Sequence, residues 1–199
     1  HIDGPAVVVV SRLVITGGDH HRLHEELTLA GGELEHNRFA RISQVGKLEA
    51  LVAQGSPIEP GQALFDVLKD RFERHEDALM AAVEARSRDR LKFLENTLDR
   101  RMKSEIADVR TVLDELEASI RKELKSDRQG GQLYLPGFTP EEMAQVKKDV
   151  HALEARLARI PEEREEEKAA IEKHYANPVD RTFPVAVVFL VPQSQARRV

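Results

Sequence analysis

The fold of this chain is decided by residues 91–124, which read LKFLENTLDRRMKSEIADVRTVLDELEASIRKEL. Apolar side chains recur there at spacings of three and four, namely Leu91, Leu94, Leu98, Met102, Ile106, Val109, Leu113, Leu116, Ile120 and Leu124. These spacings place the side chains in one narrow stripe along a helix. A narrow stripe on a charged helix is typical of a coiled-coil seam. We therefore expect a second helix to pack along this one.

That second helix is predicted to begin at Thr139. Pro140 follows at the first helical position and Glu142 completes the pattern of a capping box. Its apolar stripe consists of Val146, Val150, Leu153, Leu157, Ile160, Ile171 and Tyr175. Pro161 is expected to kink or restart the helix. The two stripes each span about 50 Å at ~1.5 Å per residue, which predicts an antiparallel hairpin with its tip at residues 126–138.

The segments on both sides of the hairpin have the composition of β-strands. Residues 6–16 (AVVVVSRLVIT) are rich in β-branched side chains and end at the turn signal Gly17-Gly18-Asp19. Residues 183–191 (FPVAVVFLV) form a second apolar run after Asn177-Pro178. We expect the terminal strands to lie in one small, mainly antiparallel sheet at the root of the hairpin.

A further hairpin is predicted around Gly31-Gly32, because two glycines have the composition of a two-residue β-hairpin loop. In that register the strands 23–30 and 33–42 pair, and Glu25 lies opposite Arg38 as a cross-strand ion pair. His36 is expected on the packed face of this pair.

A short helix is predicted at residues 44–54, with Ser43 as its cap and Gly55 just past its end. The prolines of residues 56–61 (SPIEPG) exclude a helix there. From residue 62 to 125 the chain again favours helix. The apolar stripe lapses between Val83 and Leu91, which predicts a bent or solvated helix at that point.

The predicted fold is therefore α+β, a long coiled-coil-like antiparallel helical hairpin rooted on a small β-sheet. We assign residues 1–61 to a β-rich part with a short helix and residues 62–177 to the hairpin. Residues 178–199 supply a C-terminal strand that returns to the domain of residues 1–61.

The composition limits the classes of function. Charged residues make up 33% of the chain and aromatic residues only 5%, which suits long exposed helices better than a deep core. The net charge of −5 argues against a surface that is basic throughout, so nucleic-acid contact would need a local cluster. The absence of cysteine fits a cytoplasmic location. The longest apolar stretches are too short to span a membrane. Because the chain begins without Met, we expect a fragment of a larger protein.

No pattern in the sequence predicts a catalytic residue or a bound cofactor. A phosphate-binding loop requires Gly-x-x-x-x-Gly-Lys-Ser/Thr, and the nearest approach, Gly46-Lys47, is followed by Leu48. A Gly-x-Ser-x-Gly elbow is absent as well. The many helical carboxylates do not single out an acid–base pair. The sequence therefore predicts that this segment is not an enzyme.

Histidines form the one cluster that resembles a set of metal ligands, His20, His21, His24 and His36. In a strand, His20 and His24 would share a face but lie about 13 Å apart. Without helical spacing or a cysteine partner, we predict no metal site. The alternative is a metal-dependent hydrolase that uses His20, His21 and His24.

Two groups of residues are candidates for binding. The first is a cationic cluster that could neutralise phosphates, formed by Arg86, Arg88, Arg90, Lys92, Arg100, Arg101 and Lys103. A solvated helix face is the alternative reading of these charges. The second is an apolar group at the tip that could dock on a partner, formed by Leu133, Tyr134, Leu135 and Phe138. The alternative is that these side chains fold back and cap the hairpin.

Four long stretches resemble the extreme C-terminal region of bacterial Swi/Snf-type helicases, above all the DrmD helicases of the DISARM anti-phage system. They are residues 17–32 (GGDHHRLHEELTLAGG), 84–124 (EARSRDRLKFLENTLDRRMKSEIADVRTVLDELEASIRKEL), 153–178 (LEARLARIPEEREEEKAAIEKHYANP) and 181–192 (RTFPVAVVFLVP). The resemblance covers nearly the whole chain, but it lies in long stretches rather than in a functional motif. It therefore implies no catalytic residue in this segment.

The resemblance implies a parent enzyme that hydrolyses ATP with magnesium while it translocates on double-stranded DNA. The motor motifs of that parent would lie upstream. On this basis we expect a non-catalytic accessory domain that contacts DNA or a partner protein, or regulates the motor. The expected partners are DNA, the helicase core of the same chain and other defence proteins. The alternative is a structural module for protein interaction or oligomerisation that never contacts nucleic acid.

Overall fold

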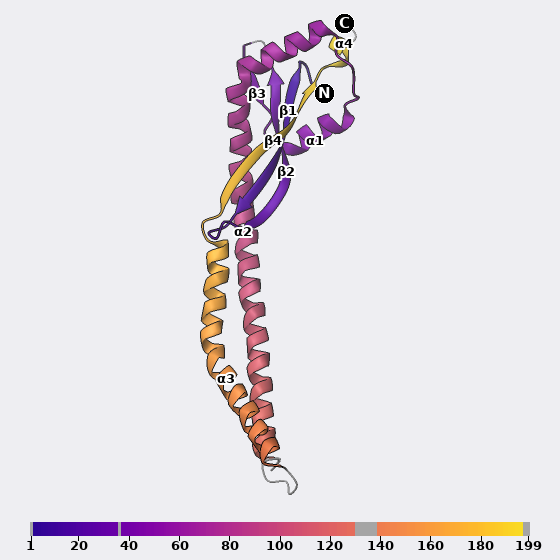
Figure 1. The fold of residues 1–199 in the computed structure, drawn as a ribbon. Coiled ribbons are helices and arrows are strands. Elements are labelled where there is room, and N and C mark those ends of the chain that lie inside the picture. Colours follow the sequence, from indigo (N-terminus) through magenta and orange to yellow (C-terminus); the bar gives the residue numbers. More distant parts are fainter. Residues whose placement is uncertain (1, 36, 130–138, 197–199) are drawn as a thin grey trace. The chain divides into compact units, whose positions relative to one another are not determined.

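The computed structural model describes residues 2–35, 37–129 and 139–196 of the chain. It has the predicted α+β class, with a long helix and a four-stranded antiparallel sheet made of N-terminal strands and the C-terminal strand. The elements are, in chain order (Figure 1), β1 (Ala6–Thr16), β2 (Arg22–Leu34), β3 (Phe39–Arg41), α1 (Val45–Gln54), α2 (Gln62–Gln129), α3 (Pro140–Tyr175), β4 (Val179–Leu190) and α4 (Gln193–Ala196).

The chain folds as two compact units. The sheet unit comprises His1–Asn96 and Asn177–Val199, and the hairpin unit comprises Thr97–Ala176. The division falls inside α2, between Asn96 and Thr97, so that this helix contributes residues to both units. Each unit has its own hydrophobic core, which is described below.

The sheet has the strand order β3-β2-β1-β4, and β1 is therefore central. β1 turns into β2 through residues 17–21, where the predicted turn signal is confirmed by a hydrogen bond from the amide of His20 to the carbonyl of Gly17. β4 pairs antiparallel with β1 along its length. The register shifts once, because Val10 pairs with Ala186 whereas Ser11 pairs with Pro184. Val185 is thus an extra residue at a β-bulge on an edge strand.

The predicted hairpin loop at Gly31-Gly32 is wrong. Both glycines lie inside β2, where Gly31 pairs with Val8 of β1 and Gly32 pairs with both Val7 of β1 and Arg41 of β3. A Cβ atom at Gly31 would lie 2.2 Å from the carbonyl oxygen of Val7, and one at Gly32 would lie 2.3 Å from that of Ala40. The glycines therefore permit close approach of the neighbouring strands, which composition alone does not separate from a turn.

Because that hairpin does not form, the predicted cross-strand ion pair between Glu25 and Arg38 does not form either. Glu25 lies opposite Val14, and its carboxylate accepts from Arg12 and Arg22 instead of Arg38. Arg38 donates to Glu35, three residues before it, with Nη2 at 2.9 Å from Oε1. His36 lies outside the described residues.

The core of the sheet unit lies between one face of the sheet and α2. We call this face the inner face. Its alternate side chains from β1, Val7, Val9, Leu13 and Ile15, are at most 1% exposed. Val7 and Val9 pack with Ala30 and Leu34 of β2 and with Leu79 and Val83 of α2. Phe72 of α2 makes an edge-to-face contact with Phe189 of β4 at 5.9 Å between ring centroids.

The predicted lapse in the α2 stripe after Val83 does not leave the helix solvated. Ser87 is only 2% exposed and donates a hydrogen bond to the carboxylate of Asp180. It accepts one from the hydroxyl of Thr182, with the two oxygens 2.8 Å apart. A polar contact between α2 and β4 thus replaces the apolar contacts on either side of it.

The short helix α1 begins one residue later than predicted. Its N-cap is Gln44, which makes no side-chain capping bond, so the prediction of Ser43 as the cap is wrong. Gly55 is the C-cap, as predicted, with an extended backbone conformation. Leu48, which is 1% exposed, anchors the helix.

The hairpin unit has the predicted antiparallel helix pair and capping box. Leu113, Ile120 and Leu124 of α2 form its core with Ile160 of α3, and five half-buried residues pack against them, namely Val109, Leu116, Val150, Leu153 and Leu157. At the start of α3 the Thr139 hydroxyl accepts from the amide of Glu142, and the Glu142 carboxylate accepts from the amide of Thr139. α3 continues through Pro161 as one helix, so the helix does not restart there.

Candidate functional site

The predicted cationic cluster on α2 is divided by the fold. Arg90 is engaged inside the sheet unit, because its guanidinium donates two hydrogen bonds to the carboxylate of Glu26 on β2, the second at 2.8 Å. Its Cζ also lies 4.9 Å from the centroid of the Phe93 ring. Hydrogen bonding from Arg90 lowers the pKa of Glu26 below its ordinary value. Arg86 is half-buried and its Nε is buried.

The other five candidate cations are exposed and are distributed over the two units. Arg88 and Lys92 belong to the sheet unit, whereas Arg100, Arg101 and Lys103 belong to the hairpin unit. Lys103 is paired with Asp99 at 2.7 Å, one helical turn away. Arg88 and Lys92 are therefore the exposed cations that the sheet unit retains from the predicted cluster.

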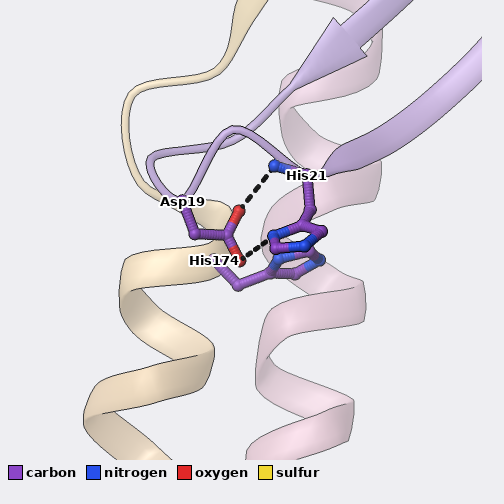
Figure 2. A group of neighbouring side chains, drawn as sticks. All are labelled: Asp19, His21 and His174. Carbon is purple, nitrogen blue, oxygen red and sulfur yellow. Dashed lines mark hydrogen bonds and ion pairs between the residues drawn. The ribbon is translucent and has the colours of Figure 1, made fainter.

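Two of the candidate histidines have a carboxylate partner, and Figure 2 draws His21 with its partner Asp19. Asp19 accepts a hydrogen bond from the amide of His21 at 2.9 Å, and its other oxygen lies 3.1 Å from Nδ1 of the His21 ring. Nε2 of His24 lies 3.3 Å from Oε2 of Glu26. His20 is the positive-φ residue of the turn between β1 and β2, at φ 65°.

The predicted docking residues at the hairpin tip, Leu133, Tyr134, Leu135 and Phe138, lie outside the described residues. Their role stays a prediction.

The structure reveals an exposed surface that the sequence did not single out. In a strand pair, residues directly opposite each other lie on the same face of the sheet. The face opposite to α2, here called the outer face, therefore carries Val14 of β1, Leu27 of β2 and Val179 and Phe183 of β4. Leu27 is 69% exposed, and Val179 and Phe183 are each 51% exposed.

The other end of the outer face is covered. Ala6 and Val8 are fully buried there, and α1 contacts β2. A Cβ atom at Gly55, just after α1, would lie 3.5 Å from Cδ2 of Leu190 on β4. Figure 1 shows the strands running past α1 toward the turn between β1 and β2. α1 thus covers one end of the outer face. The uncovered end, which carries Leu27 and Phe183, is here called the open half.

The open half of the outer face carries a surplus of positive charge. Arg12, Arg22 and Arg181 lie there with Glu25. Nε of Arg12 lies 2.5 Å from the Glu25 carboxylate, which also accepts from Arg22. Hydrogen bonding from Arg12 lowers the pKa of Glu25. Three arginines beside one ionised glutamate leave two positive charges in excess, on a chain whose net charge is −5.

A shallow depression of about 580 Å³ lies beside these residues. It is lined by Arg12, Arg22, Leu23, His24, Glu25, Glu26 and Leu27. Its open, mixed lining suits the rim of a protein contact better than a pocket that encloses a small molecule.

In the hairpin unit, Arg164 and Tyr175 of α3 make polar contacts with α2. Nη2 of Arg164 on α3 lies 2.6 Å from Asp114 and 3.2 Å from Glu117 on α2. The hydroxyl of Tyr175 donates to Glu105 at 2.5 Å. Burial and this hydrogen bond raise the pKa of Tyr175 to about 12. These contacts fix the pairing of the helices.

The comparisons with known proteins give no match. No protein-family model, no curated protein and no solved structure is significantly similar to this chain. Within the described residues, no helix is both long and apolar enough to cross a membrane.

Proposed function

We propose that this chain is a non-catalytic accessory domain of a Swi/Snf-type, ATP-dependent DNA translocase of anti-phage defence, acting in the cytoplasm through contact with a protein partner. ATP and magnesium belong to the motor and not to this segment. The resemblance of four stretches to the C-terminal region of such helicases supports the parent enzyme. The observation that supports a protein partner is the open half of the outer sheet face, where Leu27, Val179 and Phe183 are each at least half exposed.

The distribution of the α2 cations favours a protein partner over DNA. Arg90 is neutralised by Glu26, and Lys103 by Asp99. A charge that is already paired inside the fold releases fewer counterions when a phosphate approaches it. Arg88, Lys92, Arg100 and Arg101 are exposed, and they keep a DNA-contacting domain as the second candidate function.

The first experiment tests the parent enzyme. The complete reading frame that encodes this chain is expected to carry the motor motifs of a helicase, including a phosphate-binding loop, before residue 1. The purified product should hydrolyse ATP in response to double-stranded DNA, and the variant pair Leu27→Ser and Phe183→Ser should change that response. A complete reading frame without motor motifs would contradict the proposal.

A second experiment separates the two modes of contact. Fluorescence anisotropy of the chain with labelled single- and double-stranded DNA, between about 50 and 200 mM salt, measures the phosphate contacts. Reversal of Arg88 and Lys92 is the informative change, since reversal of Arg90 would also leave Glu26 without its partner. Weak binding that this reversal does not alter is expected. Tight, salt-sensitive binding that the reversal abolishes would establish the DNA-contacting function instead.

A further inference from the structure

We propose that the open half of the outer sheet face binds an acidic amphipathic helix of a partner protein. The inference rests on the proposed function, because it names the kind of partner that the accessory domain takes. The exposed apolar side chains of the face and its positive charge indicate an amphipathic, acidic partner. The position of α1 indicates that the partner segment is helical.

The apolar side chains of the face lie on all three strands and alternate with charged ones. Arg12 of β1 pairs with Leu27 of β2 on one side and with Phe183 of β4 on the other, so that the two apolar side chains flank one arginine. Val14 and Val179 belong to the next rows of the same face. A surface with this many exposed apolar side chains on neighbouring strands is typical of a protein contact site.

The charge of the face selects an acidic partner. Arg12 and Arg22 share Glu25, and Arg181 on β4 is exposed. The side chain of Arg12 is 50% exposed even while it is paired, so its remaining donors can reach a carboxylate above the sheet. An acidic partner would be attracted to this patch, and a basic partner would be repelled.

A helix fits this face better than a strand does. α1 already lies on the covered end of the same face, where Leu48 of α1 is 1% exposed and Ala6 and Val8 of β1 are fully buried. A second helix beside α1 would complete the layer, in the way that helices cover the faces of sheets in two-layer folds. Strand addition at β4 is disfavoured, because Pro184 lacks an amide proton and lies at the bulge of this edge strand.

The test uses a synthetic helix as its probe. A fluorescent peptide of about 18 residues carries Leu at positions i, i+3, i+4 and i+7 and Glu on the opposite face. One control peptide has Lys in place of Glu, and another has the acidic composition in scrambled order. Anisotropy with the whole chain is expected to show binding of the acidic peptide alone, at least about ten-fold tighter than either control.

Matched variants of the chain locate the contact. Arg12→Gln with Arg181→Gln should weaken binding at least about ten-fold and reduce its salt dependence. Arg88→Gln with Lys92→Gln removes the same charge from α2 and should leave binding unchanged. Leu27→Ser with Phe183→Ser should abolish binding while circular dichroism shows an intact fold, because both side chains are exposed.

Four results would overturn the inference. They are the absence of binding by the acidic peptide, equal binding of the scrambled or lysine peptide, and binding of labelled oligothymidine that the Leu27 and Phe183 changes abolish. The fourth is a concentration-dependent dimer that the same changes dissociate, which would make a second copy the occupant. If the acidic peptide does not bind but the reading frame carries motor motifs, the helical partner is rejected and the proposed function is retained.

Discussion

At the scale of single residues, Gly31 shows how one missing side chain sets the spacing of strands. Replacement of Gly31 by Ala would place a methyl group 2.2 Å from the Val7 carbonyl oxygen in the central strand, where backbone must move to relieve the clash. We expect Gly31→Ala to lower the free energy of unfolding by about 1–3 kcal/mol. Gly46→Ala in the first turn of α1 is the control, because the added Cβ atom would meet nothing within 4 Å. Urea denaturation of both variants would measure the difference, and equal stability would refute the close approach.

Tyr175 gives a second residue-scale prediction, which concerns pH. Its pKa is about 12 because burial and the hydrogen bond to Glu105 disfavour the phenolate. Since the folded pKa lies above the ordinary value of 10, the contribution of Tyr175 to stability is fully present below pH 10 and is lost as the pH rises toward 12. In a Tyr134→Phe background Tyr175 is the remaining tyrosine of the two. Absorbance at high pH should show a midpoint near 12 that falls to about 10 in denaturant. A midpoint near 10 in the folded protein would contradict the burial.

At the scale of elements, the ion pair between Glu26 of β2 and Arg90 of α2 joins the sheet to its covering helix. The two side chains are 22% and 28% exposed. A double-mutant cycle with Glu26→Gln and Arg90→Gln is expected to give a coupling on the order of 1–2 kcal/mol. Because the Glu26 pKa is lowered, this stabilisation is present above the ordinary carboxyl pKa and is lost as the pH falls through the folded value.

The exposed pair Glu35–Arg38 is the control for this cycle, because its side chains are 46% and 71% exposed. Exposed pairs contribute little, so its coupling should be smaller at every pH. If the coupling free energy between Glu26 and Arg90 is no larger than that of the control pair, the ion pair does not hold β2 against α2.

At the scale of the whole molecule, burial predicts how protection is distributed along the chain. β1 is central in the sheet, pairs on both sides and carries seven side chains that are at most 1% exposed, namely Ala6, Val7, Val8, Val9, Ser11, Leu13 and Ile15. Its amides should therefore exchange with deuterium most slowly in the sheet unit, and those of β4, an edge strand, several-fold faster. Mass spectrometry of peptides from the labelled protein would measure both. Equal exchange of β1 and β4 would contradict the strand order.

The parts of the fold that follow from local sequence were predictable. Apolar spacing and the capping box at Thr139 identified the helix pair, because these signals act within one or two turns. The ion pair of Arg90 could not be predicted from local sequence, because its partner Glu26 is 64 residues away. The same holds for Gly31, whose role depends on the close approach of β1, and for Ser87, whose partner lies on β4. The open outer face was missed because alternation along β2 and β4 does not show which face a helix covers.

Pro184 has a consequence for how the protein behaves at high concentration. An apolar edge strand such as β4 would ordinarily recruit identical strands from other molecules, and each addition would create a new edge for the next. Pro184 offers no amide proton for pairing with an added strand, and the bulge at Val185 increases the local twist of β4. Addition of further strands to β4 is therefore disfavoured, although this strand exposes the apolar side chains of Val185 and Val187.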